Sequence, residues 1–100
     1  MQHQLALLDA LRVQALLSLR RHRWKKAESA LEEVLARSQA LPCPYAEAKV
    51  LYVYGLLYTA RGKSQSARDQ LEAALAICAR LGERLYAQRI ERALATDSPA

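Results

Sequence analysis

Apolar residues recur along the chain at helical spacing, and four short polar or helix-breaking segments interrupt the pattern. The interruptions are 20–24, 41–44, 61–65 and 81–83. Between them the apolar positions follow i, i+3, i+4 and i+7, which is the pattern of an amphipathic helix. The pattern therefore predicts five helices joined by short connections. Their apolar positions are, in chain order, Leu5, Leu8, Leu11, Ala15 and Leu19; Ala27, Leu31, Val34, Leu35 and Leu41; Ala48, Leu51, Gly55 and Tyr58; Ala67, Leu71, Ala74, Leu75 and Cys78; and Leu85, Tyr86, Ile90 and Leu94.

Proline and glycine mark the ends of these helices. Pro42 and Pro44 lack a backbone donor and restrict the residue before them, so 41–44 stops a helix. Gly62 suits the position after a helix C-terminus, and Ser64 suits the N-cap of the next helix. Because the connections are short, neighbouring helices are expected to run antiparallel. The fold class is all-α, and strands are not expected because valine and isoleucine are few.

Segment 24–41 repeats as segment 64–81 at an offset of 40 residues. Agreement at large apolar positions arises easily between leucine-rich helices, but here the small positions agree as well. The sequence is therefore interpreted as an internal repeat of a two-helix unit. The matching pairs are Ala27 with Ala67, Leu31 with Leu71, Glu32 with Glu72, Leu35 with Leu75, Ala36 with Ala76 and Leu41 with Leu81.

Small residues stand beside large ones at fixed intervals in the stretch GLLYTARGKSQSARDQLEAAL, residues 55–75. A glycine is followed by tyrosine three residues later, then by a turn glycine, and then by alanine, leucine and alanine. This pattern resembles the consensus of the tetratricopeptide repeat family, which has these residue types at these intervals. The resemblance implies antiparallel helical hairpins stacked as a short α-solenoid of about five helices. The matching residues are Gly55, Tyr58, Gly62, Ala67, Leu71 and Ala74.

The resemblance also divides the chain, which it treats as one domain of residues 1–100. Repeat one covers about 5–41, repeat two about 45–81, and a C-terminal capping helix about 83–96. Repeat one is degenerate, with Ala15 where the consensus has glycine and His22 where it has the turn glycine. The offset of 40 exceeds the family's usual spacing of about 34 residues. Longer repeats of this kind resemble the arrays in large LuxR-type ATP-binding bacterial regulators.

Composition fits a globular protein. The chain is 52% hydrophobic and 25% charged, which is typical of a sequence that folds around a core. Its two cysteines make no disulfide framework, and free thiols fit a reducing compartment. No secretory signal and no apolar run of membrane-spanning length are visible. We therefore expect a cytoplasmic protein.

The sequence contains no recognisable catalytic or metal-binding pattern. His3 and His22 are far apart and lack acidic or thiol neighbours at ligand spacing. Glu32 and Glu33 stand at helical spacing from arginines, which is typical of solvated helix pairs. Cys78 lies on an apolar stripe, where core packing is the simpler interpretation. We expect no enzyme activity, no cofactor and no metal.

In tetratricopeptide repeats the first helix of each hairpin lines a concave groove, and the resemblance carries this groove onto seven positions. Cations around a tyrosine suit an extended peptide with acidic groups or a free carboxylate. The chain contains no asparagine, so the family's carboxylate clamp for chaperone tails is not implied. The alternative is that these positions form solvated helix faces. The candidate partner-binding residues are Arg12, Leu16, Lys49, Tyr52, Leu56, Arg89 and Arg92.

The first predicted helix is apolar nearly all round, and one hairpin partner cannot cover it. Repeat arrays require end caps with a polar outer face. Either the chain belongs to a longer array, or it associates with a second copy of itself. The candidate self-association residues are Leu5, Leu7, Leu8, Leu11, Val13 and Leu17.

The run RRHRWKK, residues 20–26, is the sequence's best case for nucleic acid. Clustered cations with one aromatic residue can hold phosphate and stack a base. The alternative is a plain hairpin turn, with Trp24 packing across it. The chain carries a net charge of +5, which attracts acidic partners or nucleic acid but does not identify them. The candidate polyanion contacts are Arg20, Arg21, Arg23, Lys25 and Lys26.

The function expected from the sequence is a non-catalytic scaffold that binds a partner peptide or protein, or another copy of itself. The alternative is a nucleic-acid-binding or regulatory module of a bacterial transcriptional regulator. The expected mechanism of the scaffold is binding to a preorganised surface, without the making of covalent bonds.

Overall fold

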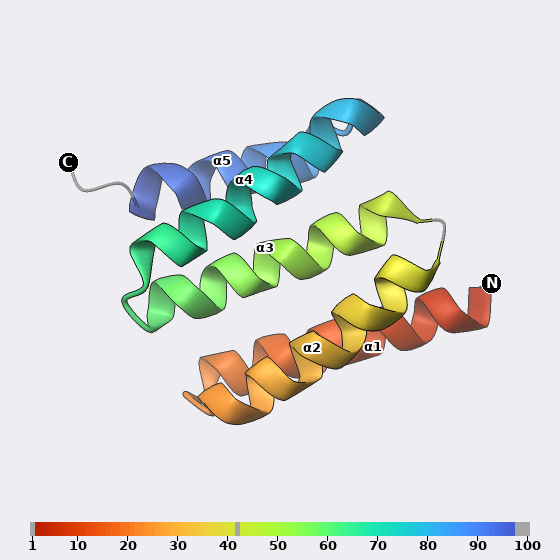
Figure 1. Ribbon diagram of the computed structural model, residues 1–100, viewed down its shortest axis with the longest axis horizontal. Helices are drawn as coiled ribbons and strands as arrows, with labels where there is room; N and C mark the ends of the chain where they lie inside the picture. The colour runs from red at the N-terminus through yellow and green to blue at the C-terminus, as the bar shows by residue number, and fades with distance from the viewer. Residues whose placement is uncertain (1, 42, 98–100) are drawn as a thin grey trace.

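The computed structural model describes residues 2–41 and 43–97 (Figure 1). Within these residues the chain forms helices and turns and no strand, which confirms the predicted all-α class. The leucine, alanine, arginine and glutamate that dominate the sequence are all strong helix formers. The helices are α1 (Gln2–Arg20), α2 (Trp24–Ala40), α3 (Pro44–Ala60), α4 (Ser64–Leu81) and α5 (Leu85–Asp97).

The helices stack as antiparallel hairpins in an elongated slab measuring 43 × 33 × 17 Å. Each helix contacts the next one along the chain, and α3 also contacts α1 and α5. Figure 1 shows the α1–α2 hairpin at one end of the stack and the α4–α5 pair at the other, with α3 between them. The first helices α1, α3 and α5 therefore line one face of a short helical solenoid.

The turns of the two hairpins have the same backbone hydrogen bonds, forty residues apart. In the α1–α2 turn the Arg23 N–H donates to the Ser18 carbonyl at 2.9 Å. In the α3–α4 turn the Lys63 N–H donates to the Tyr58 carbonyl at 2.8 Å. These bonds run from the second residue beyond the helix cap back into its last turn, and they satisfy carbonyls that the helix leaves unpaired.

A left-handed residue makes each of these turns possible. Gly62 has φ of +75° and His22, forty residues earlier, has φ of +59°. Glycine adopts this conformation freely, whereas a residue with a Cβ pays a steric cost. Lys63, and not the predicted Ser64, occupies the N-cap of α4, and its side chain makes no capping hydrogen bond. The prediction for Ser64 was wrong because the backbone bond of Lys63 places the helix boundary one residue earlier.

Burial follows the same repeat. Equivalent positions of α2 and α4 are buried in both hairpins, although the residue types differ at two of the four pairs. Helix α3 is buried on two sides, because one hydrophobic cluster joins it to α1 and α2 and a second joins it to α4 and α5. The equivalent buried pairs are Ala27 with Ala67, Leu31 with Leu71, Val34 with Ala74, and Ser38 with Cys78.

We find no helix among the described residues that is both long and apolar enough to cross a membrane.

Candidate functional site

Helix α3 carries a stripe of side chains on the face that it shares with α1 and α5. The stripe contains Tyr45, Lys49, Tyr52 and Leu56, at positions i, i+4, i+7 and i+11. Residues at this spacing project from one side of a helix. All four are partly exposed, so they remain accessible between the flanking helices.

Tyr86 of α5 joins this stripe into an aromatic cluster. Its ring meets Tyr52 edge to face at a centroid distance of 5.3 Å, and Tyr45 in the same manner at 5.9 Å. Edge-to-face pairs at such distances are favourable beyond the area that they bury. Burial raises the pKa of Tyr86 to about 12, and burial also raises the pKa of Tyr45. The phenols of Tyr86 and Tyr45 are therefore uncharged at neutral pH.

Two cations lie over the rings of this cluster. The Lys49 Nζ atom is 4.5 Å from the centroid of Tyr45, and the Arg89 guanidinium carbon is 5.6 Å from that of Tyr86. The ring face attracts a cation at these distances. The charges are thus held close to the aromatic surface while their side chains remain accessible to solvent.

An ion pair marks the α1 side of the face. Arg12 Nη2 donates to Asp9 Oδ1 at 2.8 Å within α1. This hydrogen bond, together with the charges of Arg12 and Lys49, holds the pKa of Asp9 below its usual value, against a smaller opposing effect of burial. Asp9 is thereby ionised at neutral pH and neutralises part of the positive charge on this side.

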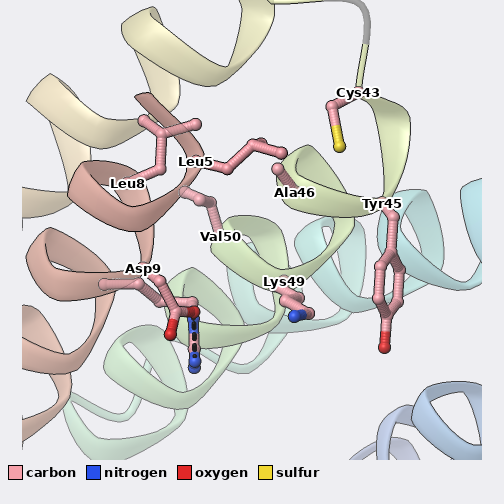
Figure 2. A pocket seen from close by; sticks show the side chains of 9 residues that line it. Leu5, Leu8, Asp9, Cys43, Tyr45, Ala46, Lys49 and Val50 are labelled. Atoms are coloured by element: carbon pink, nitrogen blue, oxygen red, sulfur yellow. Dashed lines mark hydrogen bonds and ion pairs between the residues drawn. The ribbon is translucent and has the colours of Figure 1, made fainter. Parts of the chain in front are cut away.

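A pocket of about 230 Å³ lies between α1 and α3, and we call it the α1–α3 pocket. Figure 2 shows an apolar upper part, where Leu5, Ala46 and Val50 approach one another, and polar side chains below it. An apolar cavity with a few polar groups at its edge is the usual form of a small binding site. The residues that line it are Leu5, Leu8, Asp9, Arg12, Cys43, Tyr45, Ala46, Lys49 and Val50.

A second, more open depression of about 480 Å³ lies between α3 and α5, and we call it the α3–α5 groove. It combines the edge of the aromatic cluster with two arginines of α5. The pocket and the groove therefore lie on either side of the α3 stripe. The residues that line the groove are Tyr52, Leu56, Thr59, Arg89, Arg92 and Ala93.

The structure brings six of the seven sequence-predicted groove residues to these two sites. Arg12 and Lys49 line the α1–α3 pocket, and the α3–α5 groove contains the other four, namely Tyr52, Leu56, Arg89 and Arg92. Leu16 instead packs, partly buried, against the core of the first hairpin.

Sequence reasoning missed Asp9, Tyr45 and Tyr86 as members of this face. Tyr45 shares the helical spacing of Lys49 and could have been found from it. Tyr86 was assigned to the apolar side of its helix, where it is indeed buried, and no sequence signal indicated its ring contacts.

The residues predicted for self-association divide into two groups. Leu8 is buried in the core, and Leu5 and Leu11 pack partly buried against it. These three face the interior of the hairpin. The others, Leu7, Val13 and Leu17, are 41%, 41% and 48% exposed.

The cations predicted as polyanion contacts, Arg20, Arg21, Arg23, Lys25 and Lys26, are all exposed at the α1–α2 turn. In the part of the chain that the structure describes, no group of three or more His, Cys, Asp and Glu side chains could hold a metal ion.

Stacked hairpins with an accessible face on their first helices define a helical-repeat protein of the binding type. The family model described as Tetratricopeptide repeat matches residues 6–80. The chain therefore belongs to the tetratricopeptide repeat family, whose members generally mediate protein–protein interaction and are typically non-catalytic. None of the curated proteins and none of the solved structures matches the chain.

Proposed function

We propose that the protein is a non-catalytic scaffold that captures an extended acidic segment of a partner protein across the α1, α3 and α5 face. The observation that carries this proposal is the tyrosine cluster with cations held over its rings. Tyrosine offers a large rigid contact surface at low entropic cost. The neighbouring arginines and lysine match carboxylates on the bound segment.

The geometry also favours an extended segment over a compact ligand. The α1–α3 pocket and the α3–α5 groove lie on opposite sides of the same stripe, and each contains both apolar and cationic side chains. A segment that occupies both must cross α3 and pass over Tyr52. Acidic residues that alternate with apolar ones along the segment would match this arrangement.

The test is fluorescence anisotropy with a labelled peptide in which glutamate alternates with leucine. We expect Tyr52→Ala to weaken binding at least tenfold, which is about 1.4 kcal/mol. The matched control is Tyr58→Ala, because Tyr58 is a partly exposed tyrosine of the same helix that lines neither the α1–α3 pocket nor the α3–α5 groove. Unchanged affinity of the Tyr52 variant, or an equal loss in the control, would refute the groove.

A second candidate function, self-association through α1, is supported by the repeat itself. The exposed residues Val13 and Leu17 correspond at the 40-residue offset to Val53 and Leu57 of α3, which are 1% and 0% exposed. On α3 the residues at these positions pack against the first hairpin. On α1 no described helix covers the equivalent residues. Ala6, Leu7 and Ala10 extend the exposed strip.

The opposite end of the stack favours a symmetric contact. The outer side of α5 carries the exposed polar residues Gln88 and Glu91 and so resembles a cap. Two copies of the chain would therefore associate through the exposed faces of their α1 helices and form a closed two-fold dimer. Light scattering should give a dimer mass that Leu17→Lys reduces to the monomer. The same change at Leu85, which is exposed on α5, should leave the dimer intact.

We further propose a cytoplasmic location and a place in a larger bacterial regulator of the LuxR type. The free cysteines Cys43 and Cys78 support the location, and the 40-residue repeat supports the regulator. Fractionation of the source cells with an antibody against the chain tests the location.

A further inference from the structure

Positive charge is concentrated in the two turns between paired helices. Segments 20–26 and 61–63 contain seven of the 15 lysines and arginines and no acidic residue. Elsewhere in the chain, eight basic residues are outnumbered by ten acidic ones. The net charge of +5 therefore arises from these two turns.

The two turns form one surface. Figure 1 shows both turns on the same side of the stack, at the left of the view, where α1 meets α2 and α3 meets α4. An ion pair joins them, because Arg61 Nη1 lies 3.2 Å from Glu28 Oε2 in the first turns of α2. We call this surface the basic edge, and its seven cations are all exposed. They are Arg20, Arg21, Arg23, Lys25, Lys26, Arg61 and Lys63.

Fold stability does not account for most of these cations. Arg20 lies at the C-terminus of α1, where the helix dipole favours a positive charge. Arg23 and Lys63, however, are the N-caps of α2 and α4, where the dipole disfavours it. Neither helix has an acidic residue in its first turn, and neither cap side chain makes a hydrogen bond. The cations at these N-termini therefore oppose the local preference of the helices.

We propose that the basic edge binds the phosphate backbone of a single-stranded nucleic acid. Clustered guanidinium and ammonium groups match successive phosphates, and binding releases the counterions condensed on the strand. The ring pair of His22 and Trp24, with centroids 5.1 Å apart, lies among these cations and offers a surface for base stacking. This function is separate from peptide capture, because none of the seven cations lines the α1–α3 pocket or the α3–α5 groove.

The experiment is fluorescence anisotropy of the whole chain with a labelled mixed-sequence DNA strand of about 20 nucleotides, across a salt series. Each phosphate contact contributes about −0.7 to the slope of log affinity against log salt. The variant that carries both Arg23→Gln and Lys63→Gln should make the slope shallower by about 1.4 and weaken binding about tenfold near physiological salt. Neither substitution removes a capping hydrogen bond, so the fold is retained.

The matched control carries Arg80→Gln and Arg84→Gln, which remove the same charge around the α4–α5 connection. Its affinity should stay close to that of the unmodified chain. A second variant, Lys26→Glu, separates binding from folding, because it should raise Tm by a favourable charge at the α2 N-terminus and still weaken binding. The proposal is overturned if the DNA strand does not bind at low salt, or if the control loses as much affinity as the double variant. It is also overturned if the chain binds phosphatidylserine vesicles but not the DNA strand.

Discussion

Gly55 of α3 lies directly against Leu71 of α4. A Cβ atom placed on Gly55 would be 2.5 Å from both Cγ and Cδ2 of Leu71. Leu71 is fully buried, so its side chain has no free space into which it could move. The close approach of these two helices therefore depends on the missing side chain at Gly55, which gives a physical reason for the small residue in this repeat.

We predict that Gly55→Ala destabilises the protein, although alanine is the better helix former. Overpacking a buried site costs about 1–3 kcal/mol, and the helix propensity of alanine offsets about 1 kcal/mol of this. The free energy of unfolding, measured in urea, should fall by up to about 2 kcal/mol. The reverse change in the first hairpin, Ala15→Gly, is the matched control, because Ala15 is buried at the equivalent position. Ala15→Gly should destabilise the protein, because glycine has a lower helix propensity and leaves the space of the alanine methyl group unfilled. A protein stabilised by Gly55→Ala would contradict the prediction.

A second prediction concerns the left-handed turn at Gly62. Nothing lies within 4 Å of a Cβ placed there, so a substitution tests the backbone alone. With φ at +75°, Gly62→Ala should lower the free energy of unfolding by about 1–2 kcal/mol. Gly62→Asn should cost less, because asparagine visits this conformation more readily. Equal stability of all three proteins would show that the turn tolerates a different backbone conformation.

Most of the fold was accessible from the sequence, because the periodicity of apolar residues and the glycine breaks are local signals. The αL conformation of His22 was not accessible from its residue type alone, because histidine, although enriched there among non-glycine residues, adopts it only in a minority of cases. It follows only from the 40-residue offset that places His22 over Gly62. Ser64 shows the opposite error, because its cap preference is real but the neighbouring backbone bond overrides it.

The candidate site was accessible only in part, because its groups come from three helices. Lys49 and Tyr52 were predicted from the family's groove positions; Lys49 lines the α1–α3 pocket and Tyr52 lines the α3–α5 groove. That they bind a partner stays a prediction. The contact of Tyr86 with Tyr52 depends on how α5 packs on α3, and no spacing within either helix encodes that distance. The ion pair between Arg61 and Glu28 was missed for the same reason.

A third prediction concerns alkaline pH. Burial raises the pKa of Tyr86 and of Tyr54 from 10.0 to about 12. Above pH 10 the unfolded chain loses these protons while the folded chain retains them, so stability is full below pH 10 and is lost as pH rises toward 12. Each tyrosine contributes at most on the order of 2–3 kcal/mol to the free energy of unfolding across this window.

Urea unfolding at pH 8 and near pH 11.5 measures this loss. Tyr86→Phe should reduce the pH dependence only in part, because burial also raises the pKa of Tyr54, Tyr45 and Cys78. Tyr58→Phe is the control, since Tyr58 is only partly buried. An unchanged pH dependence in the Tyr86 variant would contradict the raised pKa of Tyr86.

The last prediction concerns the carboxylate beside the proposed binding face. Asp9 accepts a hydrogen bond from Arg12 at 2.8 Å, and its pKa lies below the usual value of 3.8. Its contribution to stability is therefore present above pH 3.8 and is lost as pH falls through the folded-state value. Asp9→Asn removes this contribution at neutral pH and leaves the charge of Arg12 available to a bound carboxylate.

We expect the Asp9 variant to bind the alternating glutamate–leucine peptide about threefold more tightly, because the partly exposed charge of Arg12 is no longer paired with Asp9. The matched control is Asp69→Asn, which removes the same charge from α4, where Gln65 donates to Asp69 at 2.9 Å. The control should leave peptide affinity unchanged, because Asp69 lines neither the pocket nor the groove. Equal gains in both variants would mean that net charge, and not Arg12, governs peptide binding. A weaker peptide complex in the Asp9 variant would mean that Asp9 positions Arg12 for the ligand.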